Sequence, residues 1–250
     1  MRTWYRKEKA VASERSSAYD GNLAHAFLWP FKWLLKGSLF YIGLGVLSMT
    51  IALLLTHYYW ESPTETSALL LKIEMERISL LGVNVENTYL SFLAEKVMTF
   101  TYWLFFKFTT IHDAVVAYST GAQVNELDKL YLGQFIARNG NDIYVCMNVI
   151  QVYGIRLAIL LSTLPLFVLL NLVAFTDGIT ERYIRRACSG RESSDINKIG
   201  KMSKLLFFAM GVTVYLCAPI PLNPFFIIIP MGIVYTVATR WQWKFYKKYL

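Results

Sequence analysis

The sequence is poor in the residue types that build metal centres and disulfide frameworks. It holds only three cysteines in 250 residues, Cys146, Cys188 and Cys217. They lie far apart and form no CxxC pair, and the three histidines are equally scattered. Such spacing signals neither a zinc site nor a disulfide framework. We therefore expect no metal and no cofactor.

Catalytic motifs are lacking as well. The sequence contains no Ser-His-Asp set, no glycine-rich phosphate-binding loop and no cluster of metal ligands. Without a nucleotide-binding motif, the protein is not expected to hydrolyse a nucleotide. We expect no catalytic residues, and we do not expect an enzyme.

Charged residues are also few. They make up 17% of the chain and hydrophobic residues 55%, whereas soluble domains have about 25% and about 45–50%. With a mean hydropathy of +0.38, the composition predicts an integral membrane protein. The excess of Lys and Arg, 25 against 17 acidic residues, could suggest nucleic-acid binding, but its distribution favours a role in loop orientation. We expect no direct nucleic-acid contact.

Four apolar stretches are candidate membrane spans, since about 20 apolar residues cross the hydrocarbon core. The first, about 37–55, carries no charge and is bracketed by Trp and Tyr, which favour bilayer interfaces. The second is 157–175. The third and fourth, 205–220 and 225–238, are short and joined by 219–224, where three prolines predict a tight hairpin. A re-entrant pair is the alternative, and it gives the same topology.

Basic residues set the predicted orientation. Seven basic against three acidic residues precede the first span, seven against four lie in 177–204, and four against none follow the fourth span. The segment 59–147 has six basic and ten acidic residues. Because cytoplasmic segments carry the excess of Lys and Arg, both termini and 177–204 are predicted to be cytoplasmic, and 59–147 to lie outside.

The predicted fold is therefore an all-α integral membrane protein, with about four transmembrane helices and a helical outer segment of roughly 90 residues. More than 30 mostly polar residues precede the first span, so it is expected to remain as an anchor rather than to be cleaved as a signal peptide. In chain order, the predicted divisions are a cytoplasmic segment 1–36, a first transmembrane helix 37–58, an extracytoplasmic segment 59–147, a second transmembrane helix 148–176, a cytoplasmic Arg-rich loop 177–204, a transmembrane hairpin 205–239 and a cytoplasmic tail 240–250.

The outer segment is too hydrophobic for a disordered loop. Pro63 suits the first turn of a helix, and apolar residues follow it at near-helical spacing. The strongly aromatic run 97–111 predicts a helix packed on the membrane surface or against the spans, with a fifth, partial insertion left open. Gly121 and the run 139–141 are expected to mark turns.

Two charges interrupt apolar segments, Arg156 and Lys107. A charge inside a bilayer suggests a functional site. Each of these lies near the end of its segment, so we expect both side chains to extend to the interface.

The segment after the second span combines arginines with glycines, acids and serines. If the second helix continues into it, Glu181 and Arg185 form an i,i+4 pair. Gly190 would then end that helix, and Ser193 and Ser194 would begin the next. The plainer alternative is that these arginines set topology and neutralise anionic headgroups, at about 1 kcal/mol each.

The order of these residues resembles the signature DGxxxRxxRRxxxGRES of a family of integrating-conjugative-element membrane proteins. The layout is similar too, with an amino-terminal span, a long outer segment and three closely spaced hydrophobic segments. The family often continues with aromatic and histidine residues, whereas 195–200 reads DINKIG here, which indicates a divergent or plasmid-borne relative. The matching residues are Asp177, Gly178, Arg182, Arg185, Arg186, Gly190, Arg191, Glu192 and Ser193.

The resemblance implies an inner-membrane component of bacterial conjugative DNA transfer, of the type IV secretion class, that associates with the coupling ATPase. The arginines would offer bidentate contacts to carboxylates on that partner. Membrane lipids are the other expected contact, and self-association stays open. The predicted partner-binding residues are Asp177, Gly178, Glu181, Arg182, Arg185, Arg186, Gly190, Arg191, Glu192 and Ser193.

Two other functions remain as alternatives. In an entry-exclusion or immunity protein of a mobile element, the acidic outer segment would recognise the incoming donor, and the arginines would only set topology. A small channel or transporter is the weaker alternative, because the spans carry too few intramembrane charges.

Overall fold

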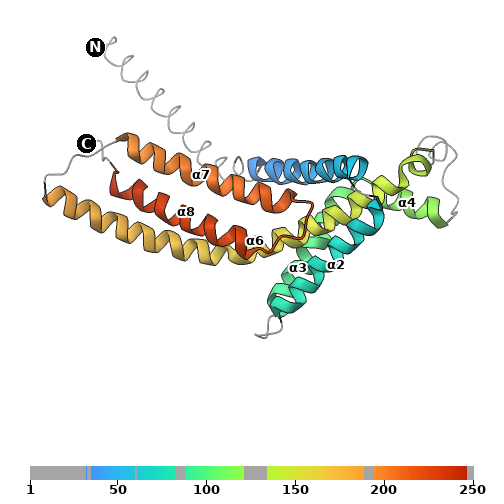
Figure 1. The fold of residues 1–250 in the computed structure, drawn as a ribbon, viewed down its shortest axis with the longest axis horizontal. Helices are drawn as coiled ribbons and strands as arrows, with labels where there is room; N and C mark the ends of the chain where they lie inside the picture. The colour runs from blue at the N-terminus through green and yellow to red at the C-terminus, as the bar shows by residue number, and fades with distance from the viewer. Residues whose placement is uncertain are drawn as a thin grey trace, which may run out of the picture. The chain divides into compact units, whose positions relative to one another are not determined.

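The computed structural model describes residue 32 and residues 35–59, 61–82, 88–120, 134–188 and 194–246. The regular elements of these residues are all helices, and no strand occurs among them (Figure 1). The all-α prediction is therefore confirmed. The elements are a first helix Leu35–Tyr58, α2 Pro63–Gly82, α3 Thr88–Tyr102, the π-helical turn η1 Trp103–Lys107, α4 Ile111–Thr120, α6 Gln134–Ala187, α7 Ser194–Cys217 and α8 Phe225–Lys244.

The chain divides into two units, Met1–Leu44 and Gly45–Leu250. The first helix runs through the division, and residues 35–44 are its part of the first unit. All the packing described below lies within the second unit.

Among the described residues, four helices are long and apolar enough to cross a membrane, which agrees with the predicted number. They are Leu35–Tyr58, Arg138–Ala187, Ile196–Cys217 and Phe225–Lys244. The two arms of the C-terminal hairpin are longer than the sequence suggested. Polar and basic residues extend α7 at its amino end, back to Ser194, and α8 at its carboxyl end, as far as Lys244. At 1.5 Å per residue, α7 and α8 reach about 36 and 30 Å, so neither is too short to span.

The helix α6 organises the second unit. It has 54 residues, and the part after a kink at Asn139 extends about 70 Å, over twice the thickness of a hydrocarbon core. The predicted boundaries 148–176 therefore fall inside one continuous helix, which extends beyond the second span in both directions. At Asn139 the backbone leaves helical geometry (φ −117°, ψ 21°), so the turn expected at 139–141 is a kink. Gly121 lies outside the described residues.

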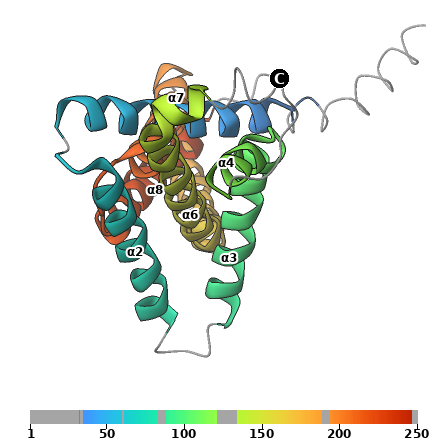
Figure 2. The same ribbon diagram turned by 90° about the vertical axis from the view of Figure 1, so that its right-hand side faces the viewer.

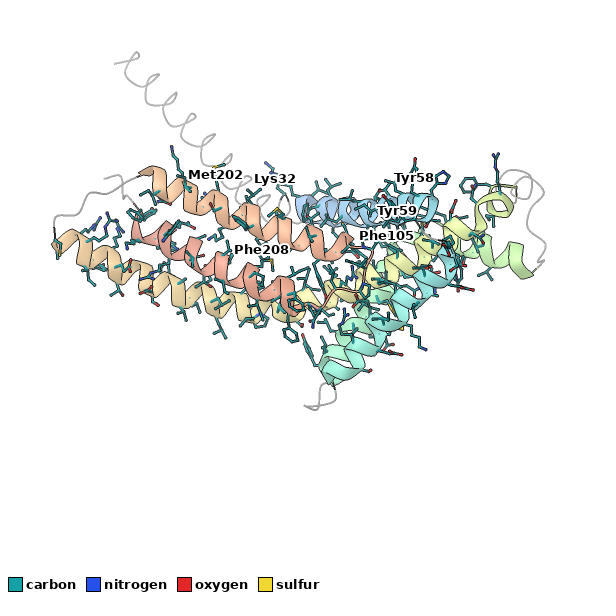
Figure 3. The ribbon with its side chains drawn as sticks, viewed as in Figure 1. Lys32, Tyr58, Tyr59, Phe105, Met202 and Phe208 are labelled. Atoms are coloured by element: carbon teal, nitrogen blue, oxygen red, sulfur yellow. The ribbon has the colours of Figure 1, made fainter. Side chains whose placement is uncertain are left out.

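The other helices pack on the two halves of α6. The hairpin of α7 and α8 lies along the C-terminal half, while α2 and α3 lie on the N-terminal half and diverge on either side of it (Figures 1 and 2). An aromatic cluster joins the hairpin of α7 and α8 to the C-terminal half of α6. The ring of Phe167 in α6 meets those of Phe208 and Tyr235 edge-on, at 5.6 and 5.7 Å between centroids. Figure 3 shows Phe208 between α7 and α8.

Close backbone approach joins α3 to the N-terminal half of α6. A Cβ atom added to Gly154 would lie 2.8 Å from the Cα of Met98, so only glycine fits there. The first helix also contacts this half, since Ala52 forms a buried cluster with Val145 and Val149. The ring of Phe105, labelled in Figure 3, occupies the space beside Gly45.

The aromatic run 97–111 is not one helix, contrary to the prediction. The α-helix ends at Tyr102, η1 follows, and a break at Thr110, where φ is +60°, precedes α4. In η1 the amide of Phe108 donates to the carbonyl of Trp103, one residue further back than in an α-helix.

Candidate functional site

The cationic end of the second unit is where α6 and α8 finish and α7 begins (Figure 1). The helix α6 continues through the Arg-rich segment as far as Ala187, and α7 starts at Ser194. Much of the segment 177–204, predicted as a loop, is therefore helical, which agrees with the helical extension considered from the sequence. Two arginines, Arg185 and Arg186, occupy the last turn of α6. Cations at this position are stabilised by the partial negative charge of the helix carboxyl end.

The two acidic residues of the predicted site pair with basic residues of α8. The carboxylate of Asp177 lies 2.7 Å from Nε of Arg240. Glu181 pairs with both Arg240 and Lys244, and its Oε2 lies 2.5 Å from Nζ of Lys244. These carboxylates therefore join α6 to α8, and they offset part of the positive charge at this end.

Two arginines of the predicted site stack on aromatic rings that follow α8. The guanidinium of Arg182 lies 5.3 Å from the centre of the Tyr246 ring, and that of Arg185 lies 4.2 Å from the Phe245 ring. Such cation–π contacts contribute about 0.5–1 kcal/mol each at exposed sites. The chain after α8 is thereby held against the end of α6.

Gly178 permits the close crossing of α6 and α8. A Cβ atom there would lie 2.9 Å from the carbonyl oxygen of Arg240 and 2.9 Å from Cβ of Trp243. The ring of Trp243 also packs edge-on against Phe175, with centroids 4.6 Å apart. The glycine of the motif is therefore explained by packing.

Fewer residues are exposed at the cationic end than the predicted site contains. Arg186 is exposed, and so are its apolar neighbours Tyr183 (68%) and Ile184 (59%). On α7 the side chains of Lys198 and Lys201 are exposed as well. The other predicted site residues, Gly190, Arg191, Glu192 and Ser193, lie outside the described residues.

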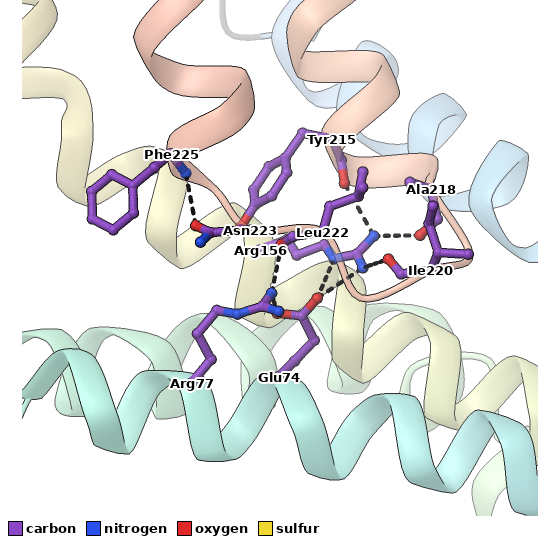
Figure 4. A network of polar contacts seen from close by, with 9 residues as sticks. All are labelled: Glu74, Arg77, Arg156, Tyr215, Ala218, Ile220, Leu222, Asn223 and Phe225. Carbon is purple, nitrogen blue, oxygen red and sulfur yellow. Dashed lines mark hydrogen bonds and ion pairs between the residues drawn. The ribbon is translucent and has the colours of Figure 1, made fainter.

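A second polar centre lies halfway along α6, around Arg156 (Figure 4). The side chains of Arg156 and Glu74 are both fully buried. Nη2 and Nε of Arg156 donate to Oε1 of Glu74 at 2.8 and 3.1 Å. The side chain of Arg156 therefore does not extend into solvent as expected, because α2 supplies a buried carboxylate for it.

Arg156 also closes the carboxyl end of α7. Its guanidinium donates to the carbonyls of Tyr215 (3.1 Å), Ala218 and Ile220 (2.6 Å). These carbonyls belong to the last turn of α7 and to the proline-rich turn after it, where no helical amide can reach them. One side chain thus fastens the turn between α7 and α8 to α6.

Arg77 completes the centre from the side of α2. Its Nη1 donates to Oε2 of Glu74 at 2.7 Å and to the carbonyl of Leu222. Two guanidinium groups thus share one carboxylate, and the negative end of the α7 dipole offsets the remaining positive charge. The arrangement binds α2, α6 and the turn 218–224 together.

Sequence reasoning noticed the unusual position of Arg156 but missed its partner. The available signal was the rule that an ionisable residue in an apolar helix has a partner nearby. Glu74 lies 82 residues away, on a helix with two other acids, Glu65 and Glu76, so spacing could not single it out. Among the described residues, no group of His, Cys, Asp and Glu could hold a metal ion.

Over the part of the chain that the structure describes, these features define an all-helical protein with four helices able to cross a membrane and a cationic cluster at one helix end. Residues 61–247 match the family described as IncC plasmid conjugative DNA transfer protein DtrJ-like. The chain belongs to this family. The resemblance to conjugation-linked proteins is thereby confirmed, while the finer assignment to integrating conjugative elements stays a prediction. No match was found among curated proteins or among solved structures.

Proposed function

We propose that this chain is an inner-membrane component of the conjugative DNA transfer apparatus, and that its cationic end docks the coupling ATPase. The observation that carries this proposal is the exposed set at the end of α6, where Arg186 stands beside Tyr183 and Ile184. Arginine and tyrosine are the residue types that contribute most to protein interfaces. Membership of a conjugative DNA transfer family supports the wider role.

The proposed contact set is chosen by exposure and is narrower than the sequence motif. Glu181, Arg182 and Arg185 are half-buried, and Asp177 forms an ion pair with Arg240 of α8. These four residues would shape the end of the bundle. Arg186 would supply the bidentate contact to a carboxylate on the partner. The exposed lysines of α7 would add a general attraction for an acidic surface.

We propose a binding role rather than an enzymatic one. The carboxylates available near the cationic end pair with arginine and lysine, which favours a structural use over acid–base chemistry. In this view, the ATPase supplies the energy for DNA transfer, and this protein positions it at the membrane.

The test compares charge reversal at Arg186 with charge reversal at Lys72, a control position on α2. Arg186→Glu combined with Tyr183→Ala should lower the frequency of DNA transfer from donor cells by about 100-fold or more, as expected when one or two interface hot spots are lost. It should also abolish co-purification of the coupling ATPase from membranes. Lys72→Glu, at an exposed position on α2, is the matched control and should leave both unchanged.

Membrane levels of each variant are measured by quantitative blotting, since a protein that fails to insert gives no information on docking. Normal transfer by an inserted Arg186→Glu, Tyr183→Ala variant would refute the proposal. Deleting the gene in donor cells addresses the entry-exclusion alternative. Loss of donation agrees with the proposal, whereas unchanged donation with increased receipt of DNA contradicts it.

A further inference from the structure

One face of α3 and η1 carries exposed aromatic and lysine side chains. The aromatic–lysine stripe consists of Tyr89, Phe92, Lys96, Phe100, Trp103 and Lys107, all of them exposed. At 3.6 residues per turn, the four positions on α3 fall within about 80° of the helix circumference, and Trp103 and Lys107 follow them on η1. The exposed fractions of Tyr89 (68%) and Phe100 (56%) are far above those of aromatic side chains in a packed interface.

The opposite face of α3 is the packed one. Ala94 and Thr101 are buried there, and the close approach at Gly154 brings Met98 and Thr101 against α6. The helix therefore cannot turn the stripe toward α6 without losing this contact. The stripe faces away from the protein because the packing face is already occupied.

Neighbouring rings of the stripe support one another. Phe100 and Trp103 stack with centroids 6.3 Å apart. The ammonium group of Lys96 lies 5.3 Å from the centre of the Phe92 ring. These contacts hold the side chains in one surface rather than leaving them as separate exposed rings.

The position of α3 along α6 places the stripe at one end of the apolar segment. Gly154, where α3 crosses, comes three residues before Leu157, the first residue of the apolar run 157–175. That separation is about 4.5 Å along a helix. The turn between α7 and α8 lies at the same level, because Arg156 binds Ala218 and Ile220. A bilayer crossed by these three helices would have its boundary here.

We infer that the aromatic–lysine stripe lies in the lipid headgroup region, with α3 resting along the membrane boundary. Aromatic rings with both apolar and polar edges favour this depth, and lysine ammonium groups reach the phosphates. A protein partner is the less favoured occupant, because lysine is depleted from the centres of protein interfaces. The inference depends on α6 crossing the membrane, and not on the docking of the ATPase.

The test measures the depth of a fluorescent probe in vesicles of phosphatidylethanolamine and phosphatidylglycerol. The full-length protein, with Cys146, Cys188 and Cys217 replaced by alanine, carries a nitrobenzoxadiazole label at Phe100→Cys. Lipids with a nitroxide on the acyl chain close to the headgroup quench probes at that depth. Two controls on α6 carry the same label, Leu169→Cys inside the apolar run and Tyr144→Cys thirteen residues before Leu157, and both positions are exposed.

The probe at Phe100 should lose most of its emission to the shallow nitroxide, while the probe at Tyr144 should lose little. Quenching of the probe at Leu169→Cys by nitroxide lipid verifies that the labelled protein is inserted. A second label at Lys96→Cys, which removes no buried contact, should behave as the Phe100 probe does. Two results would overturn the inference. In the first, the probe at Phe100 is as insensitive to nitroxide lipid as the probe at Tyr144. In the second, the probe at Phe100 is shielded from aqueous iodide but is not quenched by nitroxide lipid, which would indicate a protein contact.

Discussion

At the scale of single residues, the ion pair of Arg156 and Glu74 is the most consequential contact. Both side chains are fully buried, and the arginine also holds three backbone carbonyls of α7 and its following turn. Removing one member of a buried pair leaves the other charge without compensation, which costs about 3–5 kcal/mol. Arg77 is 20% exposed, so water can replace part of what it provides.

We predict that Glu74→Gln destabilises the protein by about 3 kcal/mol or more, because Arg156 then keeps its charge in a buried site without a carboxylate. Arg77→Met should cost about 1 kcal/mol, since its ion pair is partly screened by solvent. Thermal unfolding of the purified protein in detergent, followed by circular dichroism, measures both. Equal unfolding midpoints for the two variants would show that burial of the Arg156 pair is not important for stability.

At the scale of helices, two glycines let α8 pack closely between its neighbours. A Cβ atom at Gly178 in α6 would meet the backbone of Arg240, and one at Gly200 in α7 would lie 3.1 Å from the carbonyl of Ala238. Backbone atoms cannot move aside as a flexible side chain can. The alignment of the three helix ends, and hence of the basic residues on them, depends on these approaches.

Gly178→Ala is predicted to destabilise the protein by about 1–3 kcal/mol, the usual cost of overpacking. Its matched control is Gly140→Ala, because a Cβ atom at Gly140 meets nothing within 4 Å. In a helix, that replacement should stabilise by up to about 1 kcal/mol through the lower entropy of the unfolded chain. Chemical denaturation in mixed micelles compares the two variants, and a Gly178→Ala protein as stable as the wild type would contradict the close-packing account.

The helices themselves were largely predictable, whereas their partners were not. Long apolar runs and the proline-rich turn identify the spans, because their length and composition depend on local sequence. The extension of α6 through Arg182 and Arg185 was also visible as a helical spacing. By contrast, the pairing of Glu181 with Arg240 joins residues 59 positions apart. Contacts of this kind arise from tertiary packing, which spacing within one segment does not encode.

At the scale of the whole molecule, the account depends on which side of the membrane the cationic end faces. The charge distribution predicts the cytoplasm, where a coupling ATPase could reach Arg186. Docking would then occur at the end of α6, while the centre at Arg156 fixes the helices of the second unit against one another. The same α6 links both regions, since its 54 residues run through each of them.

Cys188 provides a direct test of this orientation. It is exposed and directly follows α6, whereas Cys217 is buried. In a Cys146→Ser variant, a membrane-impermeant maleimide added to intact spheroplasts should leave Cys188 unlabelled and should label it only after the membrane is permeabilised. Labelling of Cys188 in intact spheroplasts would place the cationic end outside the cell and contradict the proposed docking of a cytoplasmic partner.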